Sequence, residues 1–458
     1  MALSRFTRGR PQENTIVDCD APAISIVIPT RNRCGSLRRT LDALQTQTIS
    51  SSAMEVLVVL DACTDDTPRM LEHYKANFSL RSLALDPPHK GPATARNLGA
   101  RSARGPLLLF LDDDVVPDTR LVQAHIDAHT ATPNCVVLGP YLPVLQRNAD
   151  CFRVLQQTWW NDKFLSLQRY GHRFSYTDVL SGNLSIQTRR FAEVGGFDDG
   201  FPAAHEDYEL GLRLIQGGVR IIVARNATAR HHEHEHMTID RSFERARLEG
   251  RADVLLARRH ASVVHTLLFV VLHEQSAVPH RIIRSLAYDR PSLGDTLAKL
   301  LGSLLPLLDG CRFRTSFHRL YKALRYYWYL RGAAQETGSA SAVTVLLENN
   351  RLRSQQHHEI DLDLCKGLTE AEAEIDHERP EAARLWYGRQ FIGRIPFVAG
   401  SERLRSEHLR PILASSLSWS YLMCRVMEIA GQSPPARSTE DLFQSLAADE
   451  TSHAGKIN

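Results

Sequence analysis

The sequence has no closely spaced cysteine pair and no apolar run long enough to cross a membrane. Its eight cysteines are scattered, with no CxxC motif. This pattern is typical of reduced cytosolic thiols and excludes a disulfide framework or a zinc ribbon. The longest apolar stretch, Val263–Leu272, is interrupted by His265 and is shorter than the ~18 residues of a transmembrane helix. We therefore expect a cytoplasmic protein.

A strong charge of one sign is also missing. The 458 residues carry 55 Lys and Arg against 52 Asp and Glu, a formal net charge of +3. Nucleic-acid binding needs a concentrated basic face, so we expect no nucleic-acid partner. Residues 1–21 are polar and no apolar segment follows them, which predicts a flexible N-terminus and no secretory signal.

Short apolar runs alternate with helical patterns in the first quarter of the chain. The runs lie at 24–29, 55–61, 82–85 and 107–111, and helices are expected to begin near Ser36, Thr67 and Gly91. Pro68 and Pro92 fall in the first turn of their helices, where the missing N–H costs nothing. Strands alternating with helices in this way predict βαβ units and a doubly wound α/β sheet.

Three consecutive aspartates follow the most apolar of these runs. Leu107–Leu111 reads as a strand buried on both faces, and Asp112, Asp113 and Asp114 come directly after it. Open α/β sheets bind ligands at the carboxyl ends of their strands. Three adjacent carboxylates repel one another unless a cation or hydrogen-bond donors offset them, and Mg²⁺ or Mn²⁺ suits oxygen ligands. A solvated acidic turn is the alternative.

Several blocks, in order, resemble the nucleotide-binding half of a GT-A family 2 glycosyltransferase. They are Ile26–Arg33, Val58–Thr67, Gly91–Gly99 and the aspartate triplet in the place of the DxD motif. Leu180–Asn183, Gly195–Asp198 and His205–Asp207 are similar to the acceptor-side half. The resemblance covers about residues 22–240. Asp61-Ala62-Cys63 departs from the Asp-Gly-Ser common in the family, which puts backbone contacts there in doubt.

The resemblance implies a fold and an activity. The fold would be a GT-A, Rossmann-like mixed sheet. The activity would be inverting, metal-dependent transfer from a nucleoside-diphosphate sugar, with a UDP-sugar favoured, to a hydroxyl acceptor on a glycan, a lipid-linked carrier or a small molecule. The Gln-x-x-Arg-Trp block of processive synthases is absent, so single transfers are expected.

The resemblance also implies roles for individual residues. Asp61 would accept hydrogen bonds from the base, Arg96 would reach the diphosphate, and Asp112 or Asp113 would contact the ribose. Asp114 would bind Mn²⁺ or Mg²⁺ together with Asp112 and His231. The nucleotide-sugar pocket would further be lined by Pro29, Thr30, Arg31 and Arg33.

An acidic pair at the start of a helix provides the expected base. An acid at a helix start is often only a partner of the helix dipole. Inverting transfer, however, needs a carboxylate that takes the acceptor proton. Asp207 matches the second acid of the family's Glu-Asp pair, so we expect it to be the base. Glu206 would contact the acceptor, and Gly182 and Asn183 would lie on the acceptor side.

The segment Arg230–Met237 is rich in histidine. If it is extended, a period of two places His232, His234 and His236 on one face. A zinc site on that face and a solvent-exposed histidine-rich turn are both open.

The second half of the chain carries no further motif. We expect a GT-A domain over 22–260, a basic, amphipathic helical region over 261–334, a linker at 335–344, a small accessory α+β domain over 345–438 and a disordered tail at 439–458. The segment Phe313–Leu330 is expected to be a packing helix, with contact to an anionic membrane surface as the alternative. A hairpin is predicted around Gly388–Gln390.

Three rival functions remain open, and one is a zinc-binding protein that would rest on the histidine cluster alone. A transferase acting on polyprenyl phosphate, peripheral at the inner face of the membrane, would use the same donor half. A non-catalytic nucleotide-sugar-binding scaffold would keep Asp61 but have no use for Asp207.

Overall fold

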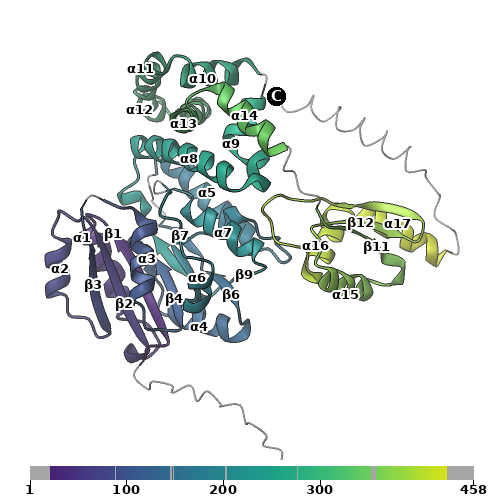
Figure 1. Ribbon diagram of the computed structural model, residues 1–458, viewed down its shortest axis with the longest axis horizontal. Coiled ribbons are helices and arrows are strands. Elements are labelled where there is room, and N and C mark those ends of the chain that lie inside the picture. Colours follow the sequence, from purple (N-terminus) through teal and green to yellow (C-terminus); the bar gives the residue numbers. More distant parts are fainter. Residues whose placement is uncertain are drawn as a thin grey trace, which may run out of the picture.

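A seven-stranded mixed sheet forms the centre of the first half of the chain (Figure 1). Its strand order is β3-β2-β1-β4-β8-β6-β9. β8 runs antiparallel to both of its neighbours, and the other pairs are parallel. The strands are β1 (Ile24–Thr30), β2 (Met54–Asp61), β3 (Ser79–Leu85), β4 (Leu107–Leu111), β6 (Cys135–Leu138), β8 (Asn183–Gln187) and β9 (Arg220–Val223). The predicted doubly wound α/β fold is confirmed.

The computed structural model describes residues 21–430 except 88, 145, 146, 148, 202, 203, 276 and 352–356. The expected flexible N-terminus, apart from Ala21, and the expected tail at 439–458 lie outside the described residues.

Helices connect the strands and bury them. β4 is enclosed, with Leu108 to Leu111 all 0% exposed, which explains its unbroken apolar sequence. The connecting helices are α1 (Cys34–Leu44), α2 (Thr67–His73), α3 (Pro92–Ser102), α4 (Leu121–Ala131), α5 (Cys151–Leu167), α6 (Thr188–Glu193) and α7 (Glu206–Gln216).

A second, three-stranded sheet lies beside the end of β4. It consists of β5 (Val115–Pro117), β10 (Ala229–His231) and β7 (Tyr141–Pro143), with β10 in the middle. β10 pairs antiparallel with β5, so that His231 is opposite Val115. This register brings His231 next to Asp114, although 117 positions separate them in the chain.

A layer of helices follows and packs against the sheet domain (Figure 1). Its helices are α8 (Ile239–Arg259), α9 (Leu268–Glu274), α10 (Val278–Tyr288), α11 (Pro291–Gly302), α12 (Leu305–Gly310), α13 (Arg314–Thr337) and α14 (Ala340–Arg351). α13 is the packing helix that the sequence favoured, because Phe317, Tyr321, Leu324 and Leu330 are buried. Among the described residues, no helix combines the length and the apolar character needed to span a membrane.

α8 and α13 cross in close contact. A Cβ at Gly332 would lie 1.8 Å from the Arg247 carbonyl oxygen, and one at Gly250 would lie 2.0 Å from that of Tyr329. Glycine at both positions therefore lets the two backbones touch.

The expected linker at 335–344 is wrong. α13 continues to Thr337, Gly338 turns the chain at φ 79°, and α14 begins at Ala340. Val343 and Leu347 of α14 are buried in the helical core. The small polar residues here form a tight turn between two packed helices, and α14 belongs to the helical layer, not to the accessory unit.

A small α+β unit lies at the C-terminal end of the described chain, to the right in Figure 1. It has its own apolar core. β12 and β13 form the predicted hairpin, and β11 pairs parallel with β12. The elements are β11 (Glu359–Asp363), α15 (Leu368–Glu378), β12 (Ala382–Tyr387), β13 (Gln390–Ile395), α16 (Ser406–Ser416) and α17 (Ser418–Ile429).

Candidate active site

A cavity of about 720 Å³ lies at the carboxyl ends of β1, β2 and β4. It is lined by all of the predicted site residues except Asn183: Pro29, Thr30, Arg31, Arg33, Asp61, Arg96, Asp112, Asp113, Asp114, Gly182, Glu206, Asp207 and His231. The two halves of the expected site therefore meet in one space.

Arg33 holds two of the three aspartates. Its guanidinium lies 2.9 Å from Asp113 Oδ1 and 2.7 Å from Asp114 Oδ2. Thr30 donates a 2.6 Å hydrogen bond to Asp113 Oδ2. Burial raises the pKa of Asp113 to about 7 in spite of the nearby Arg33 cation. Arg33, predicted as a nucleotide contact, thus also supplies the positive charge that lets the carboxylates lie close together.

Asp114 turns its other oxygen toward His231. The distance from Asp114 Oδ1 to His231 Nε2 is 3.5 Å. Burial by itself would raise the pKa of Asp114, but the hydrogen bond and charge of His231, with Arg33, hold it well below its usual range. His231 Nδ1 is buried and has no hydrogen-bond partner among the described residues.

The chemistry of three of the predicted side chains suits a divalent ion. Asp112 and Asp114 offer carboxylate oxygens and His231 an imidazole, a donor set that suits Mn²⁺ and also accepts Mg²⁺. Arg33 occupies Oδ2 of Asp114 and leaves Oδ1 facing His231. Hydrogen-bonded ligands of this kind are held in fixed orientations.

Arg96 bridges the end of β4 and the start of α7. Its guanidinium lies 2.7 Å from Asp112 Oδ1 and 2.9 Å from Glu206 Oε1. The arginine is itself only 4% exposed. Its pair with the buried Glu206 is shielded from water, whereas the Asp112 side chain is 32% exposed. Arg96 Nε is buried and has no hydrogen-bond partner among the described residues, so the expected contact with the diphosphate stays a prediction.

Asp207 lies beside this bridge at the start of α7 and also faces the cavity. Burial, followed by repulsion from Glu206, raises the pKa of Asp207 to about 6. A carboxylate with such a pKa is a stronger base than an exposed aspartate, yet it is ionised at neutral pH.

The start of α7 is anchored by the helical layer. His205, the residue before the helix, has a left-handed backbone (φ 60°). Its Nδ1 lies 2.7 Å from Asp253 Oδ1 on α8, and its ring stacks on Tyr208 at 4.5 Å. Asp253 also accepts a hydrogen bond from Tyr329 of α13.

Asp61 anchors the loop before α3. Its carboxylate accepts hydrogen bonds from the backbone N–H groups of Lys90 (2.9 Å) and Gly91 (2.8 Å), and His89 Nδ1 lies 2.5 Å away. The residue still lines the cavity, so the expected contact with a base remains a prediction.

The expected acceptor contact at Asn183 is wrong. The residue is 0% exposed and does not line the cavity. Its amide donates to the Ala227 carbonyl (2.9 Å), and its Oδ1 lies 2.9 Å from His125 Nε2. Asn183 begins β8 and holds neighbouring segments together. Gly182 does line the cavity, and a Cβ there would come within 2.9 Å of Asp112 Oδ2.

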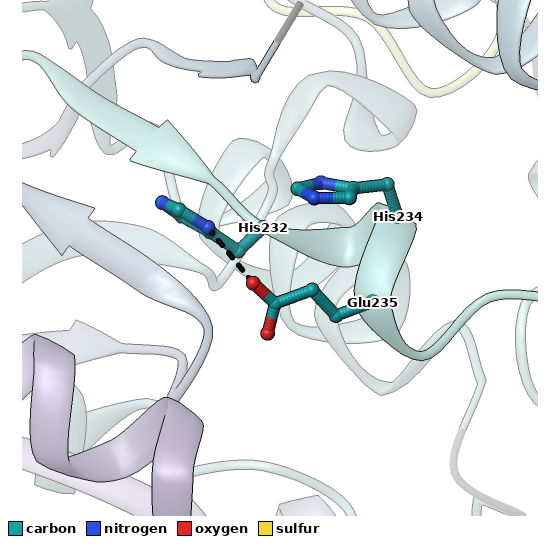
Figure 2. Close-up of side chains that lie close together, drawn as sticks. All are labelled: His232, His234 and Glu235. Atoms are coloured by element: carbon teal, nitrogen blue, oxygen red, sulfur yellow. Dashed lines mark hydrogen bonds and ion pairs between the residues drawn. The ribbon is translucent and has the colours of Figure 1, made fainter. Parts of the chain in front are cut away.

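The histidine-rich segment is not extended beyond His231. After β10 ends there, the chain forms a short 3-10 helix at Glu233–Glu235, so the condition for a common face of three histidines is not met and the segment turns instead. His236 lines the cavity with His231. His232 and His234 lie near Glu235 instead, as Figure 2 shows.

Sequence reasoning missed further cavity residues. Arg241 and Arg245 are one turn apart on α8, and Tyr141 and Trp160 form an aromatic wall against His231. The spacing of the two arginines on an amphipathic helix, directly after the histidine-rich segment, was the available signal.

Comparison with known proteins identifies the class. A doubly wound sheet with an acidic cavity at its strand ends is a GT-A arrangement, and residues 25–191 match the model of Glycosyl transferase family 2. This part of the chain is therefore similar to that family.

Two relatives are similar to about half of the chain. Validoxylamine A glucosyltransferase of Streptomyces hygroscopicus subsp. jinggangensis is 33% identical over 281 residues, which are 55% of this chain and 64% of that protein. The uncharacterized glycosyltransferase YfnE of Bacillus subtilis is 27% identical over 255 residues, 46% of this chain and 64% of that protein. In both cases slightly less than two thirds of the relative is matched.

Among solved structures, S. aureus TarS 1–349 in complex with UDP has a TM-score of 0.41 and 15% identity, over 73% of this chain and 93% of that one. A similarity of this size does not bear on the ligands of this chain.

Proposed function

We propose that this chain is a metal-dependent, inverting glycosyltransferase that moves a sugar from a nucleoside-diphosphate donor to an acceptor hydroxyl, one transfer at a time. The observation that carries the proposal is the meeting of two acidic groups in one cavity. Asp112 and Asp114 face it from β4, and Asp207 faces it from α7. Arg96 ties the two sides together.

The chain's own residues support each part of such a transfer. Asp207 would take the proton of the acceptor hydroxyl, whose oxygen would attack the anomeric carbon as the bond to the diphosphate breaks. Arg31, Arg241 and Arg245 line the cavity and offer cations to the diphosphate. Asp112, Asp114 and His231 would hold Mn²⁺ or Mg²⁺, which would neutralise charge on the departing nucleoside diphosphate.

The donor and the acceptor are testable in one screen. The purified chain would be incubated with UDP-, GDP- and dTDP-sugars, with Mn²⁺, Mg²⁺ or a chelator, and release of nucleoside diphosphate would be followed. UDP-glucose stands first, because a UDP-sugar is favoured and a relative is named a glucosyltransferase. We expect release that needs the divalent ion and rises when the correct hydroxyl acceptor is added.

Asp207→Asn tests the assignment of the base. Loss of a general base lowers turnover by about 10²–10⁴-fold, whereas affinity for the nucleoside diphosphate with Mn²⁺, measured by calorimetry, should stay near the wild-type value. Asp162→Asn, at an exposed position of α5, is the matched control. A near-normal transfer rate would place the base elsewhere, with Glu206 next. Collapse of nucleotide affinity would make Asp207 structural.

Transfer at a membrane surface is the second candidate, because α11 and α12 expose a row of leucines. Leu293, Leu300 and Leu307 are 48%, 64% and 64% exposed. Residues 279–332 carry ten Lys and Arg against three Asp, a charge balance that suits an anionic lipid surface. Flotation with anionic phospholipid vesicles, but not with neutral ones, would support peripheral binding, and Leu300→Ser with Leu307→Ser should abolish it.

A further inference from the structure

The segment after β10 presents two different sets of side chains on two sides. His231, Glu233 and His236 line the cavity, whereas His232, His234 and Glu235 do not. In Figure 2 the second set converges on one space from the end of the strand and from the short helix. One ligand atom from each of the three lies within 4.8 Å of the other two.

We propose that His232, His234 and Glu235 bind a transition-metal ion of the Zn²⁺ type at the rim of the cavity, separate from the site of Asp112, Asp114 and His231. Two imidazoles and one carboxylate are a common donor set for Zn²⁺ with one position left for water. A metal–ligand distance of about 2.0–2.2 Å in a tetrahedral site separates two donors by about 3.4 Å. His232 Nδ1 and Glu235 Oε1 are already 3.3 Å apart.

The neighbours of the cluster suit this role. Arg39 of α1 pairs with Oε2 of Glu235, so Oε1 remains directed at His232. An outer partner of this kind orients a ligating carboxylate. The Nδ1 atom of His234 is buried and without a hydrogen-bond partner among the described residues. An ion bound through this nitrogen would give it the partner that a buried polar atom needs.

The two sites would differ in preference and be linked in structure. The cavity offers mainly oxygen, which suits Mn²⁺ or Mg²⁺, while the rim cluster has two imidazoles and suits Zn²⁺. His231 is adjacent to His232 in the chain. Arg39, which pairs with Glu235, lies on α1, and Arg33, which pairs with Asp114, is the residue just before that helix. A filled rim site would therefore fix the segment that carries His231 and would pre-position it for the cavity ion.

The test uses the full chain without a histidine tag, freed of metal by a chelator, and needs no transferase activity. Zn²⁺ binding is followed by calorimetry, and Co²⁺ serves as the spectroscopic probe. We expect a Zn²⁺ site that His232→Ala and His234→Ala each weaken by more than tenfold. Arg39→Ala, which removes only the outer partner, should weaken it by about 10–100-fold. His73→Ala, an exposed histidine far from the segment in sequence, is the control.

A second pair of measurements separates the two sites. Asp114→Asn should leave Zn²⁺ affinity unchanged, and His232→Ala should retain Mn²⁺ binding, which also shows that the variant is folded. The proposal is overturned if the wild-type chain binds no Zn²⁺, or if both histidine variants bind it normally. It is equally overturned if Zn²⁺ binding is lost in Asp114→Asn, because the ion would then occupy the cavity. None of these results depends on whether the chain transfers sugars.

Discussion

At the scale of single residues, two arginines offset the repulsion between the carboxylates that line the cavity. Of the carboxylates that line the cavity, five come from the end of β4 and the start of α7. Arg33 and Arg96 pair with four of these five. Buried charges are tolerated when they are paired and hydrogen-bonded. Asp207 is the carboxylate with neither arginine as a hydrogen-bonded partner, and the environment raises its pKa.

Asp114→Asn should abolish metal-dependent turnover and leave the fold intact. A neutral amide is a poor ligand for a hard cation, while Arg33 keeps its ion pair with Asp113. Calorimetric Mn²⁺ affinity, donor turnover and circular dichroism check this, with Asp162→Asn as the control. Full Mn²⁺-supported activity in the variant would remove Asp114 from the proposed metal site.

The pH dependence of Asp207 has a defined sign. Its pKa of about 6 in the folded chain lies above the ~3.9 of an unperturbed aspartate. Turnover should therefore fall as the pH drops through about 6, because the protonated carboxyl cannot accept a proton. The free energy of unfolding changes in the opposite direction. The folded chain favours the protonated form of Asp207, and this stabilisation is lost as the pH rises through about 6.

Asp207→Asn should accordingly be inactive but more stable than the wild type at pH 8, with the difference in melting temperature shrinking at pH 5. Thermal unfolding of both proteins at pH 8 and pH 5 measures this difference in melting temperature. An equal difference at both would mean that Asp207 does not titrate in this range.

At the scale of elements, the helical layer positions the acidic pair Glu206 and Asp207. α8 reaches His205 through Asp253, and α13 braces Asp253 through Tyr329. A left-handed backbone at a non-glycine residue costs about 1–3 kcal/mol unless its surroundings hold it. This contact explains how α7 begins at Glu206 with both acids directed to the cavity.

Asp253→Asn should therefore lower turnover about tenfold with little change in donor KM, since Asp253 does not line the cavity. Losing hydrogen bonds to a charged group should also cost about 1.5–3 kcal/mol of stability. Steady-state kinetics and urea unfolding test this against Asp240→Asn, an exposed change on the same helix. If Asp253→Asn and Asp240→Asn lose turnover and stability equally, Asp253 has no positioning role.

At the scale of the whole molecule, the described chain has three apolar cores. Arg173 joins the C-terminal unit to the sheet domain. Its guanidinium donates to the carbonyls of Glu402 (2.8 Å), Glu381 (2.8 Å) and Pro396 (3.2 Å). Phe174 and Glu402 exchange hydrogen bonds beside it. The accessory unit is thus tied to the sheet domain by polar contacts.

Arg173→Ala should loosen this connection without unfolding either part, because each part has its own core. A larger radius of gyration in small-angle scattering and faster limited proteolysis between the units are expected. Arg189→Ala, an exposed arginine with one local ion pair, is the control. Unchanged scattering and cleavage would show that the remaining contacts suffice.

The amino-acid sequence was enough to predict the first four strands of the sheet and the place of its acids. Runs such as Leu107–Leu111 identify buried strands, and their side-chain pattern depends only on neighbours in the chain. The order of the motifs placed Asp112–Asp114 and Asp207 in one site, and the hairpin at Gly388–Gln390 followed from local turn chemistry.

Only the tertiary structure decided which charges pair and which polar residues are buried. Arg96 meets Glu206 across 110 positions, Asn183 is enclosed behind the cavity wall, and residues 335–344 join two packed helices. The histidine-rich segment turns at Glu233 and divides its side chains between the cavity and the cluster of His232, His234 and Glu235. These outcomes depend on segments brought together by burial of distant apolar residues, which no local period records.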